Sequence, residues 1–136
     1  MGLKLNDQTI LVIDDEQEIL DVVRELLERH DYRVLTAASG QEGLDLIRKE
    51  KIHLILLDIM MPKMSGFEVL SELKRNPETA SIPVVILTAR MEVGMIVEAK
   101  QLGAVDYVVK PFQPDDLIKW IKVYERHDPK KPPEAA

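Results

Sequence analysis

The fold of this chain is decided by the stretch Leu54-Ile55-Leu56-Leu57-Asp58, four consecutive apolar residues followed at once by an aspartate. Such an unbroken apolar run is typical of a parallel strand that is covered by helices on both faces. Four similar runs lie outward from it along the chain: Ile10-Leu11-Val12-Ile13, Val34-Leu35, Val84-Val85-Ile86-Leu87 and Val108-Val109. Because amphipathic helical patterns separate these runs, the sequence predicts a repeated strand–helix unit and an α/β fold.

Five helices are expected between and after the runs. The first is indicated by apolar residues at helical spacing, Ile19, Leu20, Val23, Leu26 and Leu27. Ser39 with Glu42, and Ser65 with Glu68, match the capping-box pattern that opens a helix. A fourth helix should run from about Val93 to Leu102 and stop at Gly103, which suits a left-handed position. The fifth helix should begin near Asp115.

Length and composition limit the classes of function. The 136 residues, 46% of them apolar, suit a single domain, expected over residues 7–127. Residues 128–136 contain three prolines and no apolar anchor, so we expect a flexible tail. The net charge of −6 disfavours direct contact with nucleic acid or an anionic membrane, and the absence of cysteine excludes a thiolate metal site. A cytoplasmic protein fits these properties.

Polar residues of complementary kinds end four of the five apolar runs: Asp14-Asp15-Glu16, Asp58, Thr88 and Lys110. In an open parallel sheet the carboxyl ends of the strands form the ligand-binding edge, so these groups should meet there. Two like unit charges about 4 Å apart repel by roughly 4 kcal/mol at an effective dielectric near 20, so three clustered aspartates need a cation. Lys110 supplies one charge only. Hard oxygen ligands of this kind predict a Mg²⁺ site that a phosphate oxygen completes.

A carboxylate at such a site can accept a phosphoryl group and form an aspartyl phosphate. Asp58 is the best candidate, because acidic residues approach it from one side and Thr88 and Lys110 from the other. The hydroxyl and the ammonium would hold the phosphoryl oxygens. Each residue alone has an ordinary interpretation as a helix cap, a strand residue or a surface charge. Their joint occurrence at successive strand ends favours the functional one.

With these motifs the chain resembles the receiver domains of two-component response regulators, from about Thr9 to Tyr124. The resemblance is carried by four segments: residues 12–16, Val-Ile-Asp-Asp-Glu; residues 57–66, Leu-Asp-Ile-Met-Met-Pro-Lys-Met-Ser-Gly; residues 87–89, Leu-Thr-Ala; and residues 103–112, Gly-Ala-Val-Asp-Tyr-Val-Val-Lys-Pro-Phe. It implies a flavodoxin-like (βα)₅ fold, a doubly wound sandwich whose five-stranded parallel sheet has the order 2-1-3-4-5 with helices on both faces.

The resemblance also assigns residues to roles. Asp58 would be the phosphoacceptor, and Mg²⁺ would be bound by the carboxylates of Asp15 and Asp58, by the backbone carbonyl of Met60, and by Asp14 mainly through a water molecule. In this family the positions of Met60 and Arg90 tune hydrolysis of the acyl phosphate. Since a methionine side chain cannot orient an attacking water by hydrogen bonding, we expect slow self-dephosphorylation.

Other residues would carry the signal. Thr88 and Lys110 would contact the phosphoryl group, and Tyr107 would be the switch aromatic that moves inward as Thr88 shifts, with the small Ala89 leaving room. A cis peptide bond is implied between Lys110 and Pro111. The expected function is a phosphorylation-activated receiver, a signalling phosphoacceptor that assists its own phosphorylation and dephosphorylation and is not otherwise an enzyme.

Expected partners follow from the same resemblance. A histidine kinase, a phosphotransfer protein or a small phosphodonor would supply the phosphoryl group. A downstream effector or output domain would read the surface formed by the fourth helix, the fifth strand and the fifth helix, where a homodimer would also form. Trp120 either lies on this surface or continues the apolar stripe of its helix into the core, and the stripe is slightly favoured. His53 is expected at a turn before the third strand.

The sequence argues against three other functions. A dehalogenase-like phosphatase also has an aspartate nucleophile but needs a second aspartate where Met60 stands. A nucleotide-binding enzyme is disfavoured because neither glycine-rich phosphate loop occurs. A receiver-fold scaffold or adaptor that works without phosphorylation is the remaining alternative. The complete set of polar strand-end residues argues against it.

Overall fold

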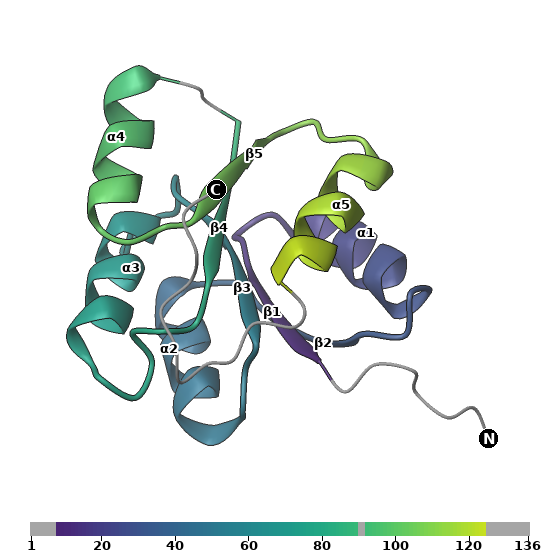
Figure 1. Ribbon diagram of the computed structural model, residues 1–136, viewed down its shortest axis with the longest axis horizontal. Helices are drawn as coiled ribbons and strands as arrows, with labels where there is room; N and C mark the ends of the chain where they lie inside the picture. Colours follow the sequence, from purple (N-terminus) through teal and green to yellow (C-terminus); the bar gives the residue numbers. More distant parts are fainter. Residues whose placement is uncertain (1–7, 90–91, 125–136) are drawn as a thin grey trace.

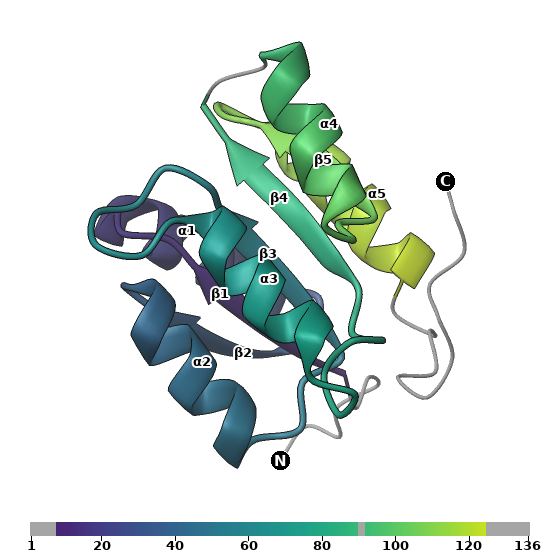
Figure 2. The ribbon, with the colours of Figure 1, turned by 90° about the vertical axis from the view of Figure 1, so that its left-hand side faces the viewer.

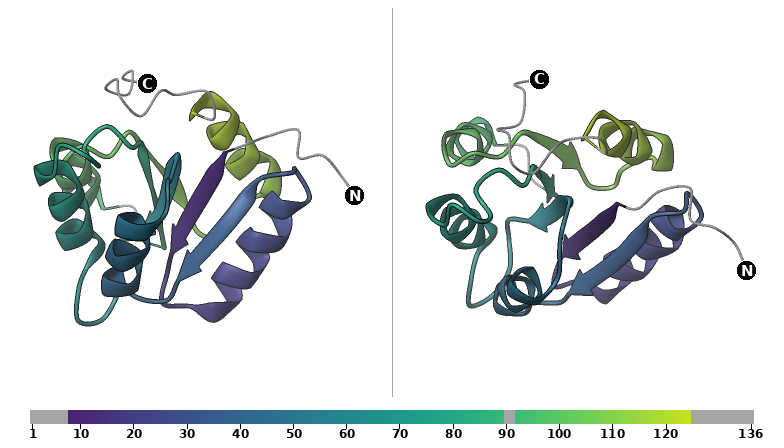
Figure 3. Two further views of the ribbon diagram at one scale, coloured as in Figure 1. Left: turned by 90° about the horizontal axis from the view of Figure 1, so that it is seen from below. Right: turned by 60° about the horizontal axis from the view of Figure 1, so that its bottom comes forward.

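The computed structural model describes residues 8–89 and 92–124 and forms three layers, with a parallel sheet between two layers of helices (Figures 1 and 3). The strands are β1 (Thr9–Ile13), β2 (Arg33–Ala37), β3 (Leu54–Asp58), β4 (Val84–Thr88) and β5 (Asp106–Val109). The helices are α1 (Gln17–Glu28), α2 (Gly40–Lys49), α3 (Gly66–Arg75), α4 (Val93–Gln101) and α5 (Pro114–Tyr124). All ten expected elements are confirmed. The expected tail and the end of the expected domain lie outside the described residues.

The strand order is β2-β1-β3-β4-β5, with every neighbouring pair parallel. The chain therefore winds in one direction from β1 to β2 and then in the other direction, from β2 past β1 to β3, and ligands of such sheets bind at the carboxyl ends of the strands where the direction reverses, here β1 and β3. This order agrees with the expected flavodoxin-like fold. It puts the ends of β1 and β3 side by side at the centre of the sheet.

The two faces of the sheet are covered by different helices. Figures 1 and 2 show α2, α3 and α4 over one face, and α1 and α5 over the other. Residues Leu11 and Ile13 of β1 belong to the core on the first face, whereas Ile10 and Val12 belong to the core on the second. Successive strand side chains point to opposite faces, so an unbroken apolar run is what a doubly covered strand requires.

Helix ends follow the local sequence signals. Ser39 Oγ accepts a hydrogen bond from the Glu42 backbone N–H at 3.2 Å, and Ser65 Oγ accepts one from Glu68 at 3.3 Å. These are the serine halves of the two expected capping boxes. Helix α4 ends before Gly103, whose φ of +109° lies in the region that favours glycine. Helix α5 begins at Pro114, one residue before the expected start.

The opposite end of the sheet is closed by polar contacts away from the strand-end aspartates. Lys74 of α3 donates hydrogen bonds to the carbonyl oxygens of Ala80, at 2.8 Å, and Ile82, at 3.0 Å, and burial lowers its pKa to about 8. His53 lies at a bend before β3, as expected, and its Nδ1 accepts a hydrogen bond from the Thr9 backbone N–H at 3.0 Å. Within residues 8–89 and 92–124, every helix falls short of the length and apolar character that a membrane span requires.

Candidate functional site

The polar strand-end residues meet at one edge of the sheet, because all five strands run in the same direction (Figure 3). Asp14 and Asp15 follow β1, Asp58 is the last residue of β3, Thr88 is the last residue of β4, and Lys110 follows β5. The backbone N–H of Lys110 donates to the carbonyl oxygen of Thr88 at 2.7 Å, which joins the ends of β4 and β5. The sequence-based grouping of these side chains is thus reproduced in three dimensions.

Three aspartates form the acidic part of the site. One carboxylate oxygen from each of Asp14, Asp15 and Asp58 lies within 4.8 Å of the others. Asp14 is fully buried, Asp58 is 3% exposed, and Asp15 is exposed. Oxygens that share one Mg²⁺ ion at about 2.0–2.1 Å lie at most about 4.2 Å apart, so small side-chain rotations suffice to gather these three around an ion. The donor set therefore fits a hard divalent cation.

Lys110 provides the positive charge of the site. Its Nζ lies 2.6 Å from Asp14 Oδ2, 3.5 Å from Glu16 Oε1 and 3.7 Å from Asp58 Oδ1, and its side chain is 8% exposed. Burial lowers the pKa of Lys110, but the hydrogen bond to Asp14 and the surrounding carboxylates outweigh burial and leave it raised. The ammonium thus stays charged while it faces the carboxylates. The peptide bond between Lys110 and Pro111 is cis, as the family resemblance implied.

Asp58 is in an environment that opposes its ionisation. Burial first, and then the charge of Asp14, raise its pKa from the ordinary 3.8 to about 7, against the opposing effects of Lys110 and the Met60 N–H. That N–H donates to Asp58 Oδ1 at 3.4 Å, while the Met60 side chain is 55% exposed. Near neutral pH a substantial fraction of Asp58 therefore carries a proton. A cation bound among the three aspartates would favour the ionised carboxylate of Asp58.

The loop after β3 brings α3 very close to the end of that strand. A Cβ on Gly66 would lie 2.3 Å from the Asp58 carbonyl oxygen and 2.7 Å from Ile59 Cα. The Gly66 N–H donates to the Ile59 carbonyl oxygen at 2.8 Å. Only glycine permits this approach, which holds the Asp58 backbone against the first turn of α3. Gly66 was not expected to have a role of its own, although its position after a capping serine was a usable signal.

Glu16 is a second residue whose role was missed. It was read only as part of the acidic run after the first strand, yet its carboxylate shares the Lys110 ammonium with Asp14 and Asp58. Its side chain is 61% exposed, so it lies at the mouth of the site. Asp14 Oδ1 accepts a hydrogen bond from the Glu16 N–H at 2.9 Å, and this contact turns the chain at Glu16. An aspartate followed two positions later by a second acidic residue was therefore the available signal.

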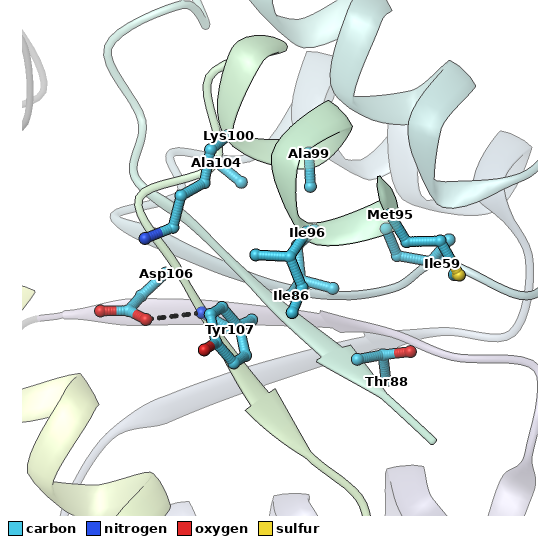
Figure 4. Close-up of a pocket in the computed structure, with 10 residues that line it drawn as sticks. All are labelled: Ile59, Ile86, Thr88, Met95, Ile96, Ala99, Lys100, Ala104, Asp106 and Tyr107. Carbon is cyan, nitrogen blue, oxygen red and sulfur yellow. Dashed lines mark hydrogen bonds between the residues drawn. The ribbon is translucent and has the colours of Figure 1, made fainter. Parts of the chain in front are cut away.

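Thr88 and Tyr107 both line a small cavity between α4 and the sheet (Figure 4). The cavity has a volume of about 10 Å³, which leaves room for about one water molecule. Thr88 is 3% exposed and Tyr107 is half-buried. Tyr107 pairs in register with Ile86 on β4, two residues before Thr88. The remaining lining is mostly apolar: Ile59, Ile86, Met95, Ile96, Ala99, Lys100, Ala104 and Asp106.

A larger groove of about 360 Å³ lies on the outer side of β5, between this strand and α5. It is lined by Tyr107, Val108, Val109, Pro111, Phe112, Gln113, Asp116, Lys119 and Trp120. Trp120 is half-buried: it packs against the core under α1 and α5 and also lines the groove. Both interpretations of Trp120 therefore hold in part. Arg90, the second residue expected to tune hydrolysis, lies outside the described residues.

Comparisons with known proteins agree with this geometry. The family model for the response regulator receiver domain matches residues 10–122. A probable transcriptional regulator, ycf27, of Cyanophora paradoxa is 41% identical over 115 residues, which cover 85% of this chain and 47% of that protein. Response regulator SaeR of Staphylococcus aureus is 39% identical over 109 residues, 80% of this chain and 46% of SaeR. This chain thus spans about half the length of these relatives.

Solved structures show the same likeness. The chemotaxis protein CheY4 of Vibrio cholerae superposes with a TM-score of 0.83 at 31% sequence identity, covering 87% of this chain and 98% of CheY4. A response regulator receiver domain protein of Clostridium thermocellum gives a TM-score of 0.78 at 38% identity, covering 85% of this chain and 91% of that one. The likeness therefore extends over nearly the whole described part of the chain.

Proposed function

Because the chain belongs to the response regulator receiver domain family, we propose that it is a phosphorylation-activated switch that accepts a phosphoryl group on Asp58 with the help of Mg²⁺. The observation that carries this proposal is the convergence of three aspartate oxygens and the Lys110 ammonium on the end of β3. In this proposal the chain has no separate substrate to turn over; it assists its own phosphorylation and dephosphorylation.

The proposed chemistry is the transfer of one phosphoryl group. An Asp58 carboxylate oxygen attacks phosphorus, the bond from phosphorus to the donor's nitrogen or oxygen breaks, and the leaving group takes the bonding electron pair. A water molecule later attacks the same phosphorus, releases inorganic phosphate and regenerates the carboxylate. Transfer of this kind depends mainly on positioning and on neutralising charge on the phosphoryl oxygens.

Each residue of the site has a proposed part in that chemistry. Asp14, Asp15, Asp58 and the Met60 carbonyl would hold Mg²⁺, which when bound offsets the charge of the aspartates and of the phosphoryl oxygens. The Lys110 ammonium, which already faces Asp58 at 3.7 Å, would bind one phosphoryl oxygen. The Thr88 hydroxyl would bind another, which draws the end of β4 towards the new group.

Transmission of the signal would follow the cavity between Thr88 and Tyr107. Movement of Thr88 towards the phosphoryl group would make room for the Tyr107 ring to move inward and for α4 to shift. The proposed output surface comprises α4, β5 and α5. In support, α4 exposes Val93 at 76% and Val97 at 47%, and a groove beside Trp120 is lined by residues of β5 and α5. Exposed apolar side chains of this kind are typical of surfaces that meet partners.

The proposed partners are a histidine kinase or phosphotransfer protein as donor and a downstream effector or output domain as receiver of the signal. A homodimer through the α4, β5 and α5 surface is a further proposed consequence of activation. The proposed site of action is the cytoplasm, which suits a chain without cysteine. The sequence offers no support for direct contact of this domain with nucleic acid, since its net charge is −6.

The test is phosphorylation by a small donor. The full chain, incubated with acetyl phosphate and Mg²⁺, should gain one phosphoryl group by intact-mass measurement, stable in acid and labile in alkali. Asp58→Asn should gain none. Asp31→Asn is the matched control, because Asp31 is exposed and its φ of +67° is one that asparagine tolerates.

The alternative function, a scaffold that works without phosphorylation, predicts a different result. Such a scaffold should remain unmodified under all these conditions, with or without Mg²⁺. Modification that persists in Asp58→Asn would mean that another residue accepts the group and would overturn the assignment of Asp58. Omission of Mg²⁺ should abolish or strongly slow the modification of the wild-type chain.

A further inference from the structure

Lys100, in the last turn of α4, lies over the ring of Tyr107. Its Nζ is 5.7 Å from the ring centroid, within the distance of about 6 Å at which a cation is attracted to an aromatic face. Both residues line the cavity beneath α4, and in Figure 4 they lie on the side of that cavity away from Thr88. The contact therefore joins the end of α4 to the aromatic side chain proposed to move.

The small size of the cavity means that the Tyr107 ring cannot move inward without displacing its surroundings. With room for about one water molecule, the cavity cannot take the Tyr107 ring unless its lining moves, and that lining includes both Thr88 and residues of α4. Helix α4 is weakly held: of its residues 93–101, all of which the structure describes, only Ala99 is buried. The contact between Lys100 and the Tyr107 ring therefore links α4 to β5, and the two must rearrange when the ring moves inward.

We propose that Lys100 is a positioning residue that holds Tyr107 in the half-buried orientation of this structure and so opposes activation of the switch. The inference rests on the proposed function, because it concerns the equilibrium that phosphorylation would shift. Inward movement of the ring takes its face away from the ammonium, so the attraction is present in one state and absent from the other. Such a difference in contacts is what is needed to bias a two-state equilibrium.

A competing explanation is that Lys100 acts through its charge alone. Asp106 lines the same cavity, is buried, and accepts the Tyr107 backbone N–H at 2.9 Å. In that explanation, loss of the Lys100 charge alters β5 through Asp106 whether or not an aromatic ring is present. Removing the ring separates the two explanations, because a double-mutant cycle isolates the interaction between Lys100 and Tyr107.

The test measures the affinity of the full chain for beryllium fluoride, a phosphoryl mimic, at saturating Mg²⁺ by calorimetry. When the binding-competent state is minor, affinity rises in proportion to its population. Lys100→Gln should therefore bind about two- to five-fold more tightly than wild type, the range that corresponds to an exposed cation–aromatic contact. Lys100→Arg keeps the cation and should bind like wild type. Lys49→Gln removes an exposed lysine from the last turn of α2 and should also leave affinity unchanged.

The decisive comparison is made in the Tyr107→Leu background, where Lys100→Gln should no longer change the affinity. A ring carbon signal of Tyr107 in the NMR spectrum should also move towards its ligand-bound position in unliganded Lys100→Gln. Equal affinities of wild type and Lys100→Gln, or the same gain without the ring, would overturn the inference while leaving the proposed function standing. Failure of the wild-type chain itself to bind beryllium fluoride would overturn both.

Discussion

Replacing Asp58 with asparagine should stabilise the metal-free protein at neutral and alkaline pH. The Asp58 carboxyl is 3% exposed, and burial followed by the charge of Asp14 raises its pKa from 3.8 to about 7. An acid whose pKa is raised by folding contributes stability that is fully present below the unfolded pKa and is lost as pH rises through the folded pKa. That window runs from pH 3.8 to about pH 7. Asparagine has a similar shape and carries no charge, so it does not suffer this loss.

The magnitude follows from the size of the pKa shift. A pKa difference of about 3 units, at 1.36 kcal/mol per unit, corresponds to ~4 kcal/mol of stability lost by the wild type between acid pH and pH 8. More than half of this loss falls between pH 5 and pH 8, because the folded pKa of about 7 lies inside that interval. The change across this interval is the better test, because any difference in packing between the two side chains is the same at each pH and cancels.

The assay is urea unfolding of wild type and Asp58→Asn in EDTA at pH 5, 6, 7 and 8. The free energy of unfolding of the variant minus that of wild type should grow from pH 5 to pH 7 and level off by pH 8. Asp31→Asn, at an exposed site, is the matched control for replacing an aspartate by asparagine. A flat difference for Asp58→Asn would refute the reasoning, since it would mean that folding does not oppose ionisation of Asp58. Addition of Mg²⁺ at pH 8 should stabilise wild type more than the variant.

Other predictions concern the loop, the helices and the phosphoryl lifetime. Gly66→Ala should destabilise the chain by more than ~2 kcal/mol in urea unfolding, because the new Cβ meets the Asp58 carbonyl oxygen, whereas Gly94→Ala, with nothing within 4 Å, should stabilise α4 by up to ~1 kcal/mol. Ser65→Ala should cost ~1 kcal/mol in the same assay through loss of the α3 cap. Phosphorylated wild type should decay slowly in Mg²⁺ buffer and Met60→Asn faster, as followed by intact mass; a wild-type lifetime of seconds would contradict the reading of Met60.

The strands and helices of this fold could be predicted from residue patterns because burial on both faces leaves an unbroken apolar run. The limits of the elements were less accurate, for identifiable reasons. Strand β5 begins at Asp106, before its apolar run, because pairing with Val85 on β4 extends it. Helix α5 begins at Pro114, since proline has no N–H to lose at the first helical position. The strand order followed from the family resemblance and not from periodicity.

The candidate site could be predicted as a set of residues, but not as a set of contacts. Asp14 and Asp15 are neighbours in sequence, yet one is fully buried and the other is exposed. Lys110 approaches Asp14 to 2.6 Å and Asp58 only to 3.7 Å, so its strongest partner is not the expected phosphoacceptor. Such differences depend on side-chain orientation around the ends of separate strands. The sequence contains the groups, while their distances come from packing.

The packing of the sheet explains which part of the molecule a phosphoryl group would move. Strands β1 and β3 are buried along their whole length, and the aspartates lie at their ends. Edge strand β5 alternates buried and half-buried residues, and α4 beside it buries only Ala99. Truncating a fully buried large aliphatic side chain to alanine costs on the order of 2–5 kcal/mol, so strands whose side chains are all buried resist displacement. New contacts made by Thr88 and Lys110 would therefore displace β5 and α4 before they disturb the strands that carry the aspartates.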